Sequence, residues 1–133
     1  MHNPYDAYKS NTVFTATKEE LTLMLYDGAL KFCNQALLAL EKKDMEKTNE
    51  MIMKVQAIIQ EFQLTLDKKF EISTQLNSLY DYIYNQLIQA NVKKDAGILA
   101  DTKEMIRSLR DTWKEAMKLN RKGQPHATVS SNQ

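Results

Sequence analysis

The chain has 133 residues, of which 43% are hydrophobic and 26% are charged, the balance of an ordinary soluble domain with one core. Eighteen basic and seventeen acidic residues leave a net charge of +1, which argues against a nucleic-acid-binding protein. One cysteine, Cys33, excludes an internal disulfide, and we find neither a long uncharged apolar run nor a signal peptide. We therefore expect a cytoplasmic protein without a membrane span.

The expected elements begin after an N-terminal stretch, residues 1–16, which lacks sustained periodicity and which we assign as a cap segment. The first long helix opens with a capping box, in which the Thr17 hydroxyl accepts from the Glu20 amide and the Glu20 carboxylate reaches back. We expect this helix to run to about Lys42.

The second and third helices are predicted from their apolar spacing. Asp44 is the expected N-cap of the second helix, which runs to about Leu66, and the third covers about residues 70–92. In both, apolar residues recur in alternating steps of three and four, as in the seam of a helical bundle. The seam residues are Met45, Thr48, Ile52, Val55, Ile59, Phe62 and Leu66, followed by Ile72, Leu76, Leu79, Ile83, Leu87 and Ala90.

The fourth helix has Asp95 as its expected N-cap. It ends near Lys122, because Gly123 and Pro125 are stop signals. Its seam is formed by Leu99, Ile106, Leu109, Trp113 and Ala116. Residues 123–133 have almost nothing to bury and are expected to form a flexible, disordered tail.

Short turns between four helices force neighbouring helices to run antiparallel. Long stretches of alternating polar and apolar residues, which would predict strands, are absent from the sequence. The expected fold is therefore all-α. It is an antiparallel up-down four-helix bundle over residues 17–122, with an extended N-terminal segment and a disordered C-terminal tail.

The apolar face of the first helix is too wide for one ordinary core. At 100° per residue, two adjoining apolar rows cover roughly two to three times the usual amphipathic stripe. The rows comprise Leu21, Leu25, Gly28, Phe32, Ala36 and Ala39, and then Leu23, Tyr26, Leu30, Cys33 and Leu37. Either this helix is buried centrally, or part of its surface is kept for a partner.

Residue types needed for catalysis are scarce in the predicted helices. Both histidines, His2 and His126, lie in the tails, so no helical histidine can ligate a metal or activate Cys33. No glycine-rich phosphate loop occurs either. We therefore expect no enzymatic activity, no metal and no cofactor.

Aromatic and methionine side chains instead indicate a binding surface. Tyr80 and Tyr84 share a helical face beside the seam, whereas Tyr82 lies opposite and should be exposed. Met51 and Ile58 form a second apolar row beside the seam of the second helix. Except for Tyr82, each of these residues is equally consistent with core packing. Their sum favours a module that binds a partner helix in a groove.

The N-terminal stretch carries two tyrosines, Tyr5 and Tyr8, in a region otherwise unfit to fold. Burying both rings gains several kcal/mol at about 25 cal/mol per Å². Ordering ~10 residues costs about 1–2 kcal/mol each, a comparable sum. The net free energy of docking this stretch on the bundle is therefore near zero, which suits a segment that a partner can displace. The competing interpretation is a frayed chain end.

Five stretches then match a known family. They are Asn3-Pro4-Tyr5 with Ala7-Tyr8, the run from Glu20 to Gly28, Tyr80-Asp81-Tyr82, Gln89-Ala90-Asn91, and Arg110-Asp111-Thr112-Trp113. Together they closely resemble the FliS family of flagellar export chaperones, over roughly residues 3–119. One departure is Gln89, where the family commonly has glutamate.

The resemblance implies a four-helix bundle that binds flagellin in the cytoplasm before export. In the family, the disordered C-terminal segment of flagellin wraps around the bundle and becomes partly helical in its grooves. The N-terminal segment can occupy the same surface, and here it would include Tyr5 and Tyr8. The implied groove residues are Tyr26, Tyr84, Ala90 and Asn91.

Two alternatives remain beside this interpretation. One is a structural helical bundle whose wide faces form a homo-oligomer interface, and the other is an enzyme or metal-binding bundle. Mixed charges on the polar faces disfavour membrane-surface binding. The expected partners are the flagellin C-terminal segment and other flagellar export or regulatory proteins, without nucleic acid or membrane. The chain itself is expected to be a monomer or a weak dimer.

Overall fold

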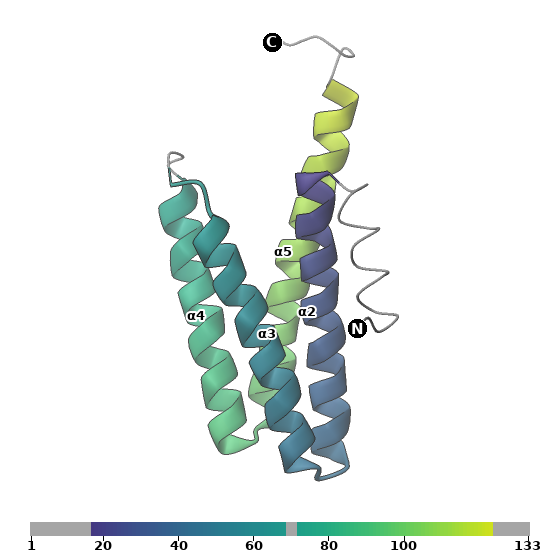
Figure 1. The fold of residues 1–133 in the computed structure, drawn as a ribbon, viewed down its shortest axis with the longest axis vertical. Coiled ribbons are helices and arrows are strands. Elements are labelled where there is room, and N and C mark those ends of the chain that lie inside the picture. Colours follow the sequence, from purple (N-terminus) through teal and green to yellow (C-terminus); the bar gives the residue numbers. More distant parts are fainter. Residues whose placement is uncertain (1–16, 69–71, 124–133) are drawn as a thin grey trace, which may run out of the picture.

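The computed structural model describes residues 17–68 and 72–123, which form the four helices of Figure 1. They are α2 (Lys18–Glu41), α3 (Met45–Thr65), α4 (Ile72–Lys93) and α5 (Ala96–Gly123). The prediction of an all-α four-helix bundle is confirmed, and every helix boundary lies within two residues of its predicted position. The predicted N-terminal cap segment, and the tail beyond residue 123, lie outside the described residues.

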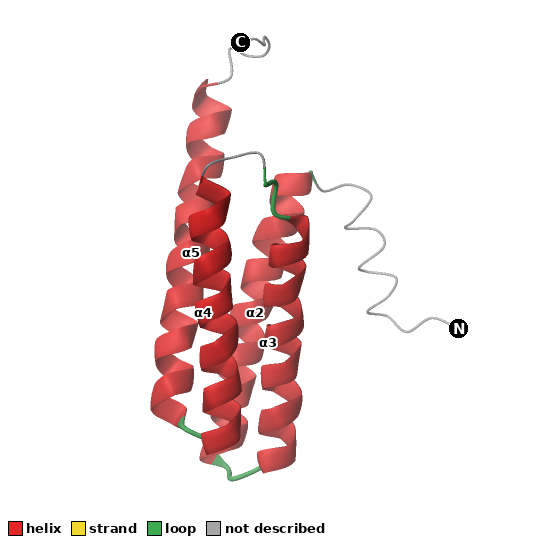
Figure 2. Cartoon of the chain, turned by 90° about the vertical axis from the view of Figure 1, so that its left-hand side faces the viewer, coloured by secondary structure: helices red, strands yellow, loops and turns green. Residues whose placement is uncertain are grey.

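The four helices form a ring of antiparallel neighbours. Helix α2 packs against α3 and α5, and α4 packs against the same two helices. The α2–α3 and α4–α5 connections lie at one end of the molecule (Figure 2), which we call the closed end. At the opposite end, the open end, the helices separate into two pairs, α2 with α5 and α3 with α4 (Figure 1).

The core is built from the predicted seam residues. Side chains from all four helices form one buried hydrophobic cluster. Its large, fully buried aliphatic members are Ile52, Val55, Ile59, Ile83, Leu87, Leu99 and Ile106. The wide apolar face of α2 is covered on two sides, because this helix has both α3 and α5 as neighbours.

Three predicted seam residues are exposed instead of buried, and for these the prediction was wrong. Met45 is the first residue of α3, where the seam ends. Ile72, which is 58% exposed, and Ala116 both lie at the open end. Seam spacing assumes that neighbouring helices stay in contact along their whole length, and at the open end the two pairs do not.

The predicted capping box at the start of α2 is confirmed. The Glu20 backbone N–H donates to Thr17 Oγ1 over 3.0 Å, and the Thr17 N–H donates to Glu20 Oε1 over 2.9 Å. Glu19 and Glu20 also place negative charge in the first turn, where it complements the helix dipole. Helix α2 therefore has a well-defined start at the open end.

The turn between α2 and α3 is a Schellman motif that leads directly into an N-cap. The Lys43 N–H donates to the Leu40 carbonyl over 3.0 Å, and the Asp44 N–H donates to the Ala39 carbonyl over 2.8 Å. Lys43 adopts a left-handed conformation with φ 61°. Asp44 Oδ1 then accepts from the Lys47 N–H over 3.1 Å, as an N-cap does.

The turn between α4 and α5 repeats both the sequence and the geometry of the first. Again two lysines precede an aspartate, and Lys94 is left-handed with φ 50°. The Asp95 N–H donates to the Ala90 carbonyl over 3.0 Å, and Asp95 Oδ1 accepts from the Ile98 N–H over 3.0 Å. Asp44 and Asp95 are thus both confirmed as N-caps, and each also completes the preceding helix.

Replacing Lys43 by glycine is expected to raise the free energy of unfolding by about 1 kcal/mol, because glycine adopts the left-handed conformation without steric cost. Urea denaturation followed by circular dichroism measures the change. Lys42→Gly is the matched control, since Lys42 has φ −84° and gains nothing from glycine. A Lys43→Gly variant no more stable than Lys42→Gly would contradict the expectation.

Candidate partner-binding pocket

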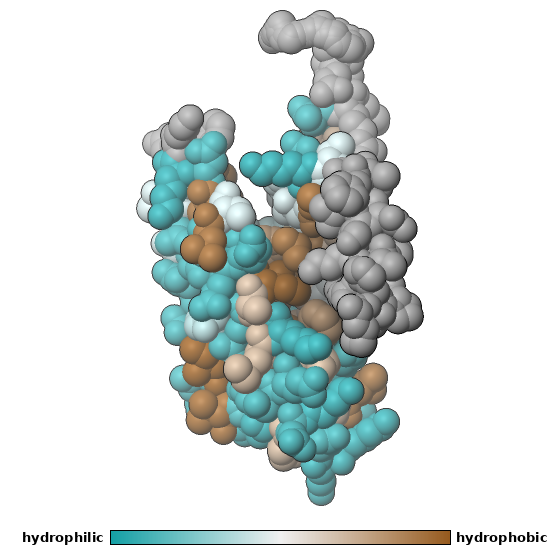
Figure 3. All heavy atoms as spheres, viewed as in Figure 1, coloured by the Kyte–Doolittle hydropathy of each residue, from teal (hydrophilic) through white to brown (hydrophobic). Residues whose placement is uncertain are grey.

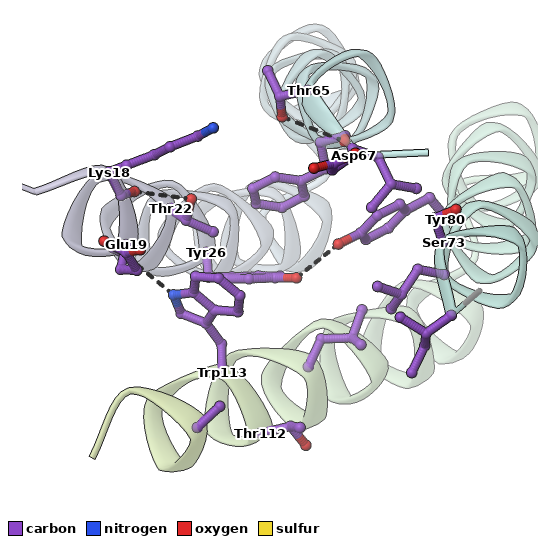
Figure 4. Close-up of a pocket in the computed structure, with 16 residues that line it drawn as sticks. Lys18, Glu19, Thr22, Tyr26, Thr65, Asp67, Ser73, Tyr80, Thr112 and Trp113 are labelled. Carbon is purple, nitrogen blue, oxygen red and sulfur yellow. Dashed lines mark hydrogen bonds between the residues drawn. The ribbon is translucent and has the colours of Figure 1, made fainter. Parts of the chain in front are cut away.

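An apolar pocket of about 480 Å³ receives side chains from all four helices at the open end. We call it the open-end pocket. Figure 3 shows the hollow between the two helix pairs, with hydrophobic atoms at its floor, and Figure 4 shows its lining. The lining residues are Lys18, Glu19, Thr22, Tyr26, Phe62, Thr65, Leu66, Asp67, Ile72, Ser73, Leu76, Tyr80, Leu109, Thr112, Trp113 and Ala116.

Three aromatic rings from α2, α3 and α4 form the floor of the pocket. The ring centroids of Tyr26 and Phe62 are 4.4 Å apart, and those of Phe62 and Tyr80 are 5.6 Å apart. The Tyr26 and Tyr80 hydroxyl oxygens lie 2.9 Å from each other (Figure 4). Burial raises the pKa of both tyrosines above the ordinary value, so both remain neutral phenols.

One wall of the pocket is held together by polar contacts between α5 and α2. Trp113 Nε1 donates to the Glu19 carbonyl over 3.0 Å. Arg110 Nη1 contacts Asp27 Oδ1 over 2.7 Å, and Arg110 Nε contacts Asp111 Oδ1 over 2.7 Å. Hydrogen bonds to these two carboxylates raise the pKa of Arg110. The Arg-Asp-Thr-Trp stretch therefore joins α5 to α2 beside the pocket.

The opposite wall, α3 with α4, is joined on its outer side by polar side chains. Gln63 Nε2 donates to Asp81 Oδ1 over 2.7 Å, and Gln60 Nε2 donates to the Tyr84 hydroxyl over 3.3 Å. Nearer the closed end, Asn91 Nδ2 donates to Asn49 Oδ1 over 2.7 Å. The outer α3–α4 seam is therefore hydrogen-bonded, whereas the inner side of the pair faces the apolar pocket.

The mouth of the pocket combines apolar walls with a rim of mixed charge. Ile72 is largely exposed there, and Leu66 and Leu76 are half-buried. The charged lining residues, Lys18 and Glu19 among them, are exposed. A concave apolar surface with few polar groups suits an apolar segment better than a charged ligand.

Six of the eight residues predicted to contact a partner lie in the described part of the chain, and of these six only Tyr26 lines the open-end pocket. Met51 and Ala90 are buried in the core, and Ile58 is half-buried against it. Tyr84 and Asn91 are half-buried on the hydrogen-bonded α3–α4 seam. The remaining two, Tyr5 and Tyr8, lie outside the described residues. The partner-binding role of all eight stays a prediction.

The pocket residues that sequence reasoning missed are mainly Phe62, Leu76 and Trp113. Seam spacing assigned all three to the core, whereas Tyr80 was weighed both as an interface residue and as a residue at the edge of the core. The available signal was that Tyr80 and Trp113 both fall in stretches that resemble the FliS family. Tyr82, predicted to be exposed, is 52% exposed.

Cys33 lies in the core, where burial raises the pKa of its thiol to about 12.

Within residues 17–68 and 72–120, no three histidine, cysteine, aspartate or glutamate side chains gather as a metal ion requires. None of the helices in the described part of the chain combines the length and apolar composition of a membrane span.

Comparisons of the sequence with known proteins point to one family. The family described as flagellar protein FliS matches residues 1–120. The chain is 48% identical to the flagellar secretion chaperone FliS of Bacillus subtilis over 122 residues, 92% of each chain. It is 32% identical to the chaperone of the same name from Salmonella typhimurium, covering 79% of this chain and 80% of the relative. The chain therefore belongs to the FliS family of flagellar secretion chaperones.

Proposed function

We propose that this chain is a cytoplasmic export chaperone that binds the disordered C-terminal segment of flagellin in the open-end pocket and prevents its premature polymerisation. Membership of a family of flagellar secretion chaperones supports the export role. The observation that carries the proposal is the pocket itself, an apolar cavity with an aromatic floor and an exposed isoleucine at its mouth. Such a surface suits an apolar partner.

In this mechanism the chain covers an apolar segment of flagellin and catalyses no reaction. Apolar side chains of the flagellin segment enter between the two helix pairs, and the charged rim stays in contact with water. A segment covered in this way cannot bury the same side chains against another flagellin. Ordering the segment uses part of the interaction energy, which keeps the affinity moderate and permits release at the export apparatus.

Residues 1–16 serve, in this proposal, as a displaceable cover for the same pocket. Lys18 and Glu19 line the pocket, so the residues that precede Thr17 are joined directly to its rim. The rings of Tyr5 and Tyr8 compete with flagellin for the apolar walls. Because the gain from burial and the cost of ordering nearly cancel, flagellin can displace this cover.

Replacing Ile72 by aspartate is expected to weaken flagellin binding by about tenfold, since a charge at the mouth must be desolvated on binding. The side chain is 58% exposed in the free protein, so folding is expected to persist. The measurement is calorimetric titration with a peptide of roughly the last 40 residues of flagellin from the same organism.

Val92→Asp is the matched control, because Val92 is a 76% exposed apolar residue of the same helix outside the pocket lining. It should bind as the parent does. If the parent does not bind the peptide, the proposed function fails. If Ile72→Asp and Val92→Asp bind equally well, the peptide does not use the open-end pocket.

A further inference from the structure

The floor of the open-end pocket holds a hydroxyl proton without an acceptor in the described part of the chain. Tyr26 and Tyr80 are 4% and 5% exposed, and their hydroxyl oxygens are 2.9 Å apart. Each phenol supplies one donor and two acceptor lone pairs. Only one of the two protons can lie in the bond between them, and neither hydroxyl bonds to another side chain or backbone group of residues 17–68 and 72–120.

This proton is placed to meet a molecule that enters the pocket. Tyr26 comes from α2 and Tyr80 from α4, and Figure 4 shows their hydroxyls meeting across the cavity. A wholly apolar occupant would cover this donor without supplying an acceptor, which is unfavourable, so an occupant that supplies an acceptor is preferred.

The surroundings favour an uncharged acceptor. The floor is made of aromatic rings, and among the described lining residues the one cation, Lys18, is exposed at the rim, as are Glu19 and Asp67. A carboxylate brought to this floor would lose its hydration without gaining a cation. An amide loses less, since its oxygen accepts the spare proton and its N–H can donate to a lone pair of the tyrosine pair.

We propose that the Tyr26–Tyr80 hydroxyl pair is a specificity-determining site that hydrogen-bonds an uncharged amide group of the flagellin segment, with the amide oxygen accepting the spare hydroxyl proton. The proposal rests on the function proposed above. The pocket walls favour apolar side chains, and the hydroxyl pair adds a preference for an amide group at the floor. The amide can be a backbone group or an asparagine or glutamine side chain.

The test compares the full-length parent with Tyr26→Phe, Tyr80→Phe and the double variant. Binding of the flagellin C-terminal peptide is followed by calorimetry and by the fluorescence of Trp113, the single tryptophan, which lines the pocket. The double variant is expected to bind about 3- to 10-fold more weakly, the value of one hydrogen bond. Each single variant keeps one hydroxyl that can donate, so its affinity should stay within about twofold of the parent.

Tyr82→Phe is the matched control, because Tyr82 is exposed and lies outside the pocket lining. Absence of binding by the parent would refute the proposed function. Binding by the parent with an unchanged affinity of the double variant would refute the hydroxyl-pair proposal alone. Should the double variant not fold, 3-fluorotyrosine at position 80 provides a stronger donor. Tighter binding then supports the proposal, and unchanged or weaker binding overturns it.

Discussion

Replacing Leu87 by alanine is expected to lower the free energy of unfolding by about 2–5 kcal/mol, the range for truncating a fully buried leucine. Leu87 is 0% exposed and belongs to the cluster that joins all four helices. The loss combines the transfer energy of the deleted carbons with the cost of a cavity that the packed helices cannot close. Urea denaturation followed by circular dichroism measures the change.

Leu64→Ala provides the comparison, because Leu64 is 81% exposed near the end of α3. The same chemical change there is expected to alter stability by less than about 0.5 kcal/mol. Equal losses in the two variants would mean that the core of the free protein is not packed as described.

Raising the pH above 9 is expected to destabilise the protein steeply. In the folded state burial raises the pKa of Cys33 from its ordinary value of 9.0 to about 12. The unfolded chain therefore releases this proton first, so the stabilisation is complete below pH 9 and is lost as the pH rises toward 12. The loss amounts to about 1.4 kcal/mol per pH unit.

Tyr26 and Tyr80 also make the folded state less stable as the pH rises, because burial raises the pKa of each above its ordinary value of 10.0. The slope should therefore increase above pH 10. Thermal unfolding between pH 8 and 11 measures both phases. Cys33→Ala is expected to start from a lower stability but to show little change between pH 9 and 10. If Cys33→Ala lost stability between pH 9 and 10 as steeply as the parent does, groups other than Cys33 would cause that loss.

The helices could be predicted because their signals are local. Apolar spacing of three and four, together with Thr17, Asp44 and Asp95 as caps, defined four helices whose boundaries the structure confirms. Each cap depends on atoms only three residues apart, so sequence neighbours suffice to determine it.

The pocket could not be predicted because it depends on the angle between helix pairs. Ile72 follows the spacing of a seam residue, but α2 and α5 lie too far away at the open end to cover it. Tyr26 and Tyr80 are separated by 54 residues, and no sequence pattern brings their hydroxyls to 2.9 Å. Trp113 was assigned to the seam, and only the arrangement of four helices reveals that it borders a cavity.

The polar contacts of the two helix pairs explain why the bundle can keep an apolar cavity open. Arg110 and Trp113 attach α5 to α2, while Gln60 and Gln63 attach α3 to α4. These contacts act within each pair and not across the pocket. Each pair is therefore held together at the open end without closing the space that separates it from the other.

The two lysine–lysine–aspartate turns have a consequence for how the molecule tolerates insertions and deletions. In each turn the aspartate both finishes one helix and starts the next, so one added residue would uncap two helices at once. It would also rotate the following helix by about 100° relative to its neighbours. Phe62 and Trp113 would then point away from the cavity, although both turns lie at the far end of the molecule from it.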